Sequence, residues 1–147
     1  MRANDLWRSL FRAVAGIYWL YFASQKWTGV GWMAPFIQAA ARANPIPGLH
    51  ELLVTVVAPH WYWFALAQAV GETVAGVCLL LGVATRKAAV LGFLLALNLA
   101  LTVAFLTPDL GFRWLYYLAL LVSAELVFAD PGSIALQRYK FLPAWLR

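Results

Sequence analysis

The chain has 147 residues, of which 64% are hydrophobic, 16% aromatic and 12% charged, with a formal net charge of +5 at pH 7. Soluble domains carry about 25% charged residues, so this composition excludes an ordinary soluble globule and favours an integral membrane protein. The single cysteine, Cys78, excludes an intrachain disulfide and a cysteine-rich metal or iron–sulfur site. Nucleic acid is not expected as a partner, because the basic residues are spread over the predicted helix ends and form no patch.

Four apolar runs predict membrane-spanning helices at about 10–26, 61–83, 88–106 and 112–129. A helix of about 20 residues crosses the hydrocarbon core of a bilayer. The first run is bulky and aromatic from Tyr18 to Phe22 and offers no convincing small-residue cleavage site, which favours a retained helix over a cleaved signal peptide. The sequence therefore predicts an all-α, integral membrane four-helix bundle that forms a single domain over residues 1–147.

The distribution of Lys and Arg predicts that both termini lie in the cytoplasm, because cytoplasmic loops carry an excess of these residues. With this orientation the cytoplasmic side receives Arg2, Arg8, Arg12, Arg86, Lys87, Arg138, Lys140 and Arg147. The outer side receives Lys26, Arg42 and Arg113. Aromatic residues near the predicted outer boundary, including Trp61, Trp63, Trp114, Tyr116 and Tyr117, are interpreted as an interfacial anchoring belt.

The connections between the predicted helices differ in length. A tight inner turn at Thr85 to Lys87 makes the second and third helices an antiparallel hairpin. The long outer loop, Lys26 to His60, is apolar enough to carry short interfacial helices, one from Met33 to Arg42 and another in the stretch Leu49 to Ala58. The tail, 131–147, alternates aromatic and basic residues and is expected to rest as an amphipathic segment on the inner leaflet.

Polar residues inside the predicted spans are functional candidates, because an ionisable side chain at mid-membrane is costly. Glu72 lies near the middle of the second span, and Gln68 precedes it by one helical turn on the same face. The third span contributes Asn98 and Thr102, also one turn apart. Their depth predicts one central site, with Glu72 as the catalytic residue and Gln68, Asn98 and Thr102 as binding residues.

Basic residues are expected at both ends of this site. Lys26 and Arg113 are placed to close its outer mouth and to take part in substrate binding. Glu125, about one turn from the inner end of the fourth span, is expected to form a structural ion pair. Its partner would be Arg86, Lys87 or Arg12.

Two interpretations of the polar core remain open. In one, Glu72, Gln68 and Asn98 form a buried hydrogen-bond network that fixes the helix register. In the other, they handle protons or hold the headgroup of a quinone. No metal site is expected, since His50 and His60 are ten residues apart and match no tight ligand spacing.

Several motifs resemble the DoxX/DoxD-like membrane family, and they extend over about 12–129. The first helix has Arg12-x-x-x-Gly16 running to Ser24-Gln25-Lys26, and the second has Gly71-Glu72-x-x-x-Gly76. Leu79-Leu80-Leu81-Gly82-Val83-Ala84-Thr85-Arg86 and then Asn98 follow in the same order. Lys26, Glu72, Arg86 and Asn98 match the recurring polar positions of that family.

The resemblance implies a membrane subunit of a quinone-linked oxidoreductase, similar to the DoxD subunit of thiosulfate:quinone oxidoreductase. Such a subunit would pass electrons from thiosulfate or a related sulfur donor to a quinone that is not covalently bound. Its partners would be the lipid bilayer and other redox subunits or a second copy, in a bacterial or archaeal cytoplasmic membrane. The alternative is a non-catalytic accessory or scaffold subunit of a larger respiratory or photosynthetic complex, so whether the chain is itself an enzyme stays open.

Overall fold

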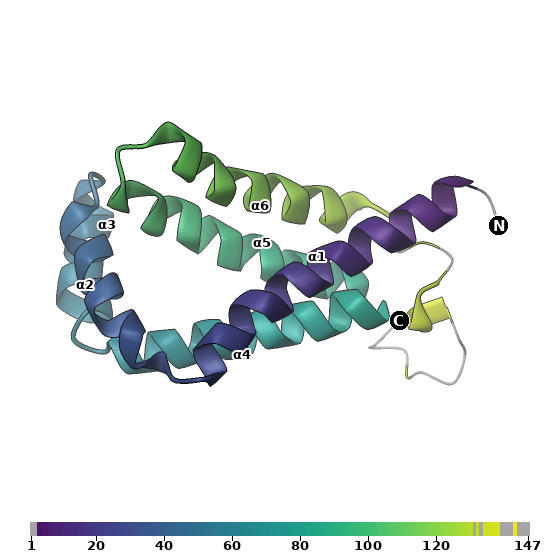
Figure 1. Cartoon of the computed structure of the whole chain (residues 1–147), viewed down its shortest axis with the longest axis horizontal. Helices are drawn as coiled ribbons and strands as arrows, with labels where there is room; N and C mark the ends of the chain where they lie inside the picture. The colour runs from purple at the N-terminus through teal and green to yellow at the C-terminus, as the bar shows by residue number, and fades with distance from the viewer. Residues whose placement is uncertain (1–2, 131, 133, 139–142, 144–147) are drawn as a thin grey trace.

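The computed structural model describes residues 3–130, 132, 134–138 and 143, and all regular secondary structure among them is helical. The long helices are α1 (Ala3–Trp27), α4 (Trp61–Leu81), α5 (Thr85–Leu101) and α6 (Leu110–Phe128) (Figure 1). The prediction of an all-α fold is confirmed. The predicted amphipathic tail over 131–147 lies largely outside the described residues.

Three helical segments among the described residues are long and apolar enough to cross a membrane: Trp61–Leu81, Thr85–Leu106 and Leu110–Phe128. They correspond to the second, third and fourth predicted spans. The first predicted span lies within α1, whose 25 residues give a length of roughly 38 Å. This helix is not among the three apolar segments, because its mean hydropathy is lowered by polar and amphipathic residues as well as by its charged ones.

Helices α1 and α4 form a closely packed antiparallel pair (Figure 1). At their crossing, a Cβ atom on Gly16 would lie 2.6 Å from the backbone nitrogen of Leu80 and 2.9 Å from the carbonyl oxygen of Gly76. The two backbones therefore approach to a distance that only glycine permits at this position. Small residues have this role in membrane helices, where packing must hold helices together without a hydrophobic driving force.

Helices α5 and α6 form the second pair, through small buried residues that include Ala88, Ala96 and Ala119. Trp19 of α1 joins the two pairs: its side chain is 1% exposed and packs against Gly92 of α5. In Figure 1 the two pairs cross near the middle of α1 and diverge towards α2 and α3. The wide end of this V-shaped arrangement is where a cavity forms.

A cap made of the long loop closes the wide end (Figure 1). It comprises η1 (Val30–Trp32), α2 (Met33–Ala43), α3 (Pro47–Leu52) and the π-helical segment η2 (Leu53–Val57). The predicted short helix from Met33 is confirmed as α2, and the apolar stretch after it divides into α3 and η2. Buried Asn44 fixes the cap to the bundle, since its Nδ2 donates to the carbonyl oxygen of Leu101 at 2.7 Å. This carbonyl lies where α5 ends and the 3-10 segment η3 (Val103–Leu106) begins, a position that leaves backbone acceptors without helical partners.

Arg12 ties the opposite end of the bundle together. Its side chain is buried, and its guanidinium donates to the carbonyl oxygens of Leu79, of Leu80 at 3.1 Å and of Ile134 at 2.8 Å. The acceptors on α4 are among the last carbonyls of that helix, which are unsatisfied within it. Arg12 therefore joins α1, the end of α4 and the segment after α6.

Gln137, in the 3-10 segment η4 (Leu136–Arg138), caps α5 from a distant part of the chain. Its side-chain Oε1 accepts from the backbone nitrogen of Thr85 at 2.9 Å and from the Thr85 hydroxyl at 2.6 Å. The backbone nitrogen of Gln137 donates to the Gly82 carbonyl at 2.9 Å. The preceding residue, Ala84, offers no side-chain cap. A tight turn joins α4 and α5 as predicted, but it lies at 82–84, because Gly82 ends α4 in the left-handed conformation and Thr85 to Lys87 form the first turn of α5. The Gln137 contact stabilises this turn.

Candidate functional site

A buried ion pair lies at the centre of the candidate site. Lys26 Nζ is 2.9 Å from Oε1 and 2.8 Å from Oε2 of Glu72, and the two side chains are 7% and 1% exposed. Lys26 also donates to the carbonyl oxygen of Phe22 at 3.3 Å. These three contacts use all the donors of the ammonium group.

The packing of α1 on α4 produces this pair. Glu72 lies on the same small-residue seam of α4 as Ala65, Ala69 and Gly76, so it faces α1 and not the outside of the bundle. Lys26 lies in the last turn of α1, and its long side chain lies back towards the middle of α4. A buried carboxylate requires a partner of opposite charge, which Lys26 supplies.

A chain of hydrogen bonds extends from Glu72 to α5. Gln68 Nε2 donates to Glu72 Oε1 at 2.9 Å, and Asn98 Nδ2 donates to Gln68 Oε1 at 3.4 Å. The Thr102 hydroxyl donates to the backbone carbonyl of Asn98 at 2.6 Å. The structure thus brings together Glu72, Gln68, Asn98 and Thr102, which the sequence places at one depth, and adds Lys26 as the partner of Glu72.

A cavity of about 680 Å³ lies beside this network, between α1, α4, α5, α6 and the cap. Its volume falls in the range of about 300–1,000 Å³ that is typical of small-molecule sites. Most lining residues are aromatic or aliphatic, and the charged ones are Lys26 and Glu72. Because these two form an ion pair, the charged groups of the wall sum to zero.

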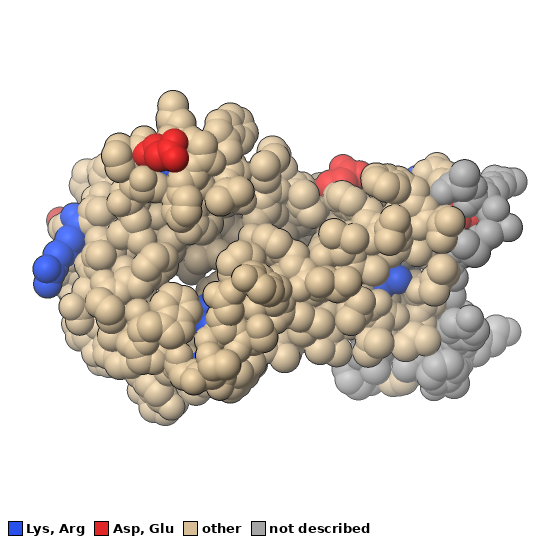
Figure 2. Space-filling model, viewed as in Figure 1, with Lys and Arg blue, Asp and Glu red and all other residues tan. Residues whose placement is uncertain are grey.

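The cavity opens through the side of the bundle. Figure 2 shows this face hollowed near the cap, between the α1–α4 pair and the α5–α6 pair, with few charged atoms around the hollow. Helices α1 and α6 make few contacts with each other. Tyr18 and Phe22 of α1 and Phe112 and Tyr116 of α6 are among the residues that line the cavity. The opening therefore faces across the helix axes.

Arg113 is not brought to the cavity. Its Nε donates to the carbonyl oxygen of Thr107 at 2.9 Å, and its guanidinium carbon lies 5.7 Å from the centroid of the Phe105 ring. The residue therefore stabilises the turn before α6, and it does not line the mouth where the sequence analysis placed it. The short turn holds the side chain back over the end of η3.

The described residues form no ion pair between Arg86 and Glu125. Both side chains are exposed, on the outward faces of α5 and α6, because the two helices pack through their small residues. Arg12, the third partner considered for Glu125, is used at the end of α4 instead. The structure brings neither Arg86 nor Glu125 to the candidate site.

Tyr18 and Tyr116 line the cavity but were not among the predicted site residues. The sequence analysis interpreted Tyr116 as a membrane anchor at the outer boundary and considered Tyr18 only as part of the bulky aromatic run of the first span. A usable signal was present in the spacing: Tyr18 and Phe22, like Phe112 and Tyr116, are one helical turn apart, and their ring centroids lie 4.9 and 5.6 Å apart.

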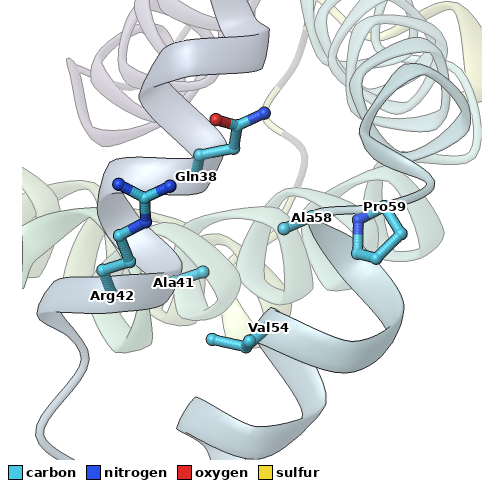
Figure 3. A pocket seen from close by; sticks show the side chains of 6 residues that line it. All are labelled: Gln38, Ala41, Arg42, Val54, Ala58 and Pro59. Carbon is cyan, nitrogen blue, oxygen red and sulfur yellow. The ribbon is translucent and has the colours of Figure 1, made fainter.

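A smaller pocket of about 300 Å³ lies on the cap, between Gln38 and Arg42 of α2 and the facing segment that carries Val54, Ala58 and Pro59 (Figure 3). The Gln38 and Arg42 side chains are exposed to solvent, so this pocket lacks the desolvated polar groups of the main cavity. Among the described residues, no group of three or more His, Cys, Asp or Glu side chains is arranged to hold a metal ion.

The sequence model of the DoxX family matches residues 8–106. The matched region runs from α1 to the end of η3 and contains the whole polar network, whereas α6 lies outside it. No match was found among curated proteins or among solved structures.

Proposed function

The chain belongs to the DoxX family and is a multi-pass membrane protein, and we propose that it is the membrane subunit of a quinone-linked oxidoreductase. One observation carries the proposal: a cavity of about 680 Å³, apolar and uncharged overall, contains a hydrogen-bonded polar network on one wall. An uncharged ring with oxygen substituents and an apolar chain matches this combination. The resemblance to DoxD adds the donor, thiosulfate or a related sulfur compound.

The proposed topology has four membrane spans: α1 and the three apolar segments named above. Both termini lie in the cytoplasm. Eight Lys and Arg residues on the cytoplasmic side against three on the outer side support this orientation. The membrane would be the cytoplasmic membrane of a bacterium or an archaeon. In this arrangement the Lys26–Glu72 pair lies inside the bundle at the depth of the hydrocarbon core, where an ionisable pair marks a functional position.

The residues of the network have distinct roles in this proposal. A bound quinone would accept two electrons and two protons. Asn98 is exposed to the cavity and holds an oxygen of the headgroup, since its Oδ1 and its second amide hydrogen have no partner among the described residues. Both protons come from water, one of them by way of the Glu72 carboxyl. Gln68 orients that carboxyl through its Nε2 hydrogen bond, and Lys26 offsets the charge of the carboxylate. Thr102 fixes the backbone that carries Asn98.

The sulfur donor binds elsewhere in this proposal. Thiosulfate is an anion, and the cavity wall has no excess positive charge because Glu72 neutralises Lys26. Arg113 contacts Thr107 and Phe105 and does not line the cavity. A partner subunit would therefore oxidise the donor and pass the electrons to the quinone in this chain.

The test is donor-dependent quinone reduction by the protein with its natural partners in proteoliposomes, together with equilibrium binding of a decyl-substituted benzoquinone. Glu72→Gln should lower turnover by about a hundredfold or more, within the range of about 10²–10⁴ that general acid–base groups contribute. Glu125→Gln, on an exposed carboxyl outside the cavity, is the matched control and should keep wild-type turnover. Absence of both quinone binding and quinone reduction by the wild type would refute the proposal.

The second candidate function is a non-catalytic accessory subunit. Its support is the exposure of α6. In the most apolar stretch of α6, 17% is buried inside the protein, whereas 39% is buried in the corresponding stretches of Trp61–Leu81 and Thr85–Leu106. Such a helix presents most of its surface to lipid or to a neighbouring subunit. Stoichiometric co-purification with a larger complex, combined with equal turnover of that complex with wild-type and Glu72→Gln subunits, would favour this function over the first.

A further inference from the structure

We propose that Tyr18 and Tyr116 form a recognition gate at the side of the cavity, through which a lipid-soluble ligand enters from the bilayer between α1 and α6. The two hydroxyls would bind oxygen atoms of the ligand headgroup. The identity of the ligand as a quinone rests on the proposed function. The position of the gate rests on the geometry alone, so the two can be tested separately.

The first argument concerns the polar groups that remain available in the cavity. Neither the Tyr18 hydroxyl nor the Tyr116 hydroxyl forms a hydrogen bond with any described residue, and both residues are half-buried and line the cavity. By contrast, Lys26 has used its three donors, and the Thr102 hydroxyl already donates to a backbone carbonyl. A tyrosine hydroxyl that lines a cavity without a protein partner is free to donate to a ligand oxygen.

The second argument concerns the position of the two tyrosines. Tyr18 lies on α1 and Tyr116 on α6, the two long helices that make few contacts with each other. Each contacts the ring of a phenylalanine one turn away, Phe22 and Phe112, at interplanar angles of 59° and 73°, and all four rings line the cavity. Phe22 and Phe112 are 36% and 42% exposed, so the aromatic rim is continuous with the outer surface.

The third argument concerns the direction of the opening. It faces across the helix axes (Figure 2), and the cap covers the wide end of the bundle (Figure 1). In a membrane-spanning bundle, an opening across the helix axes meets lipid and not water. Leu115, which also lines the cavity, is 58% exposed and extends the apolar rim along α6.

These features select a chemical class of ligand. The gate fits an uncharged headgroup with hydrogen-bonding oxygens and an apolar chain that stays in the opening. The charged groups of the wall, Lys26 and Glu72, neutralise each other, so no excess positive charge in the wall offsets an anionic headgroup. Phospholipids with anionic headgroups and small sulfur oxyanions are therefore poor ligands for the gate.

The first experiment tests recognition by removing one oxygen at a time. Tyr18→Phe and Tyr116→Phe should each weaken binding of a decyl-substituted benzoquinone to the protein in nanodiscs by about five- to tenfold, the value of one hydrogen bond. Tyr21→Phe and Tyr117→Phe are matched controls on the same two helices, because neither residue lines the cavity, and binding should stay within about twofold of wild type. Equal binding by all four variants would overturn the recognition role.

The second experiment tests the lateral opening without a quinone. In a Cys78→Ala background, one variant carries a nitroxide at Leu95→Cys on the cavity wall. A separate variant carries the nitroxide at Leu99→Cys on the same wall. Molecular oxygen, which concentrates in lipid, should enhance the relaxation of these labels in liposomes, whereas the water-soluble complex Ni-EDDA should not. Preferential relaxation by Ni-EDDA would overturn the lateral opening. If oxygen enters but the wild type binds no quinone, the opening stands and the quinone function fails.

Discussion

Lys26 reaches from the last turn of α1 to Glu72 at the middle of α4, with its Nζ 2.9 and 2.8 Å from the two carboxylate oxygens. This ion pair joins α1 and α4 on the cavity side. Farther along the two helices, Gly16 allows their backbones to pack closely at Gly76 and Leu80. Through Gln68 the same carboxylate is connected to Asn98 on α5. The pair therefore belongs both to the packing of the bundle and to the wall of the proposed quinone site.

Lys26→Met should destabilise the protein by about 3–5 kcal/mol, because it leaves the Glu72 carboxylate buried without a partner. The double variant Lys26→Met/Glu72→Gln should recover most of this loss, since both charges are then gone. The measurement is the free energy of unfolding in mixed detergent micelles. The exposed Arg42→Met is the control, and a double variant as unstable as Lys26→Met alone would contradict the pairing.

Arg12→Lys should lower the free energy of unfolding by about 2 kcal/mol. An ammonium group cannot reach the carbonyls of Leu80 and Ile134 with the fixed geometry of a guanidinium, so at least one acceptor at the end of α4 loses its donor. Arg8→Lys, four residues earlier on an exposed face of α1, makes the same chemical change and should have little effect. Equal stabilities for the two variants would show that Arg12 does not join the helix ends.

Gly16→Ala should separate α1 from α4 and cost about 1–3 kcal/mol, because the added methyl group would lie within 3 Å of backbone atoms that cannot rotate away. Gly31→Ala is the control, since nothing lies within 4 Å of its added methyl. Thermal unfolding monitored by Trp fluorescence reports both variants. Unchanged stability of Gly16→Ala would mean that the two helices are farther apart than described.

The sequence predicted the helices and the depth of the polar residues, because apolar runs and one-turn spacing follow directly from helix geometry. It did not predict the Lys26–Glu72 pair as such. Because Lys26 follows the apolar run, the sequence predicts that it lies at the outer boundary. In the structure its flexible side chain folds back along α1 into the bundle. The spacing along one helix cannot show how far a lysine side chain from another helix reaches.

Contacts between segments that are distant along the chain could also not be predicted from the sequence. Gln137 caps α5 from 52 residues away, and Arg12 binds the Ile134 carbonyl across 122 residues. Such hydrogen bonds leave no periodic pattern, because one partner is a backbone atom that every residue has. Tyr18 and Tyr116 were missed for a different reason. Tyr18 belongs to the aromatic run of the first span, and Tyr116 was interpreted as a boundary anchor, whereas their place on the cavity wall follows from the packing of distant helices.

Single cysteines should report the proposed topology, since Cys78 is the only native cysteine and can be replaced by alanine. In intact cells, a membrane-impermeant maleimide should label Gly48→Cys on the cap but not Lys87→Cys in the first turn of α5. After the membrane is opened, both should react. Labelling of Lys87→Cys from outside would contradict the orientation with both termini in the cytoplasm.

The most direct test of the quinone site is photolabelling of the protein in nanodiscs with an azido-substituted benzoquinone that carries a decyl chain, followed by mapping of the modified peptides. The account predicts saturable labelling near Tyr18, Asn98 and Tyr116, which an excess of unlabelled quinone removes and which Tyr21→Phe and Tyr117→Phe leave intact. Labelling that is confined to outward residues of α6 such as Leu118, and that unlabelled quinone does not reduce, would contradict it.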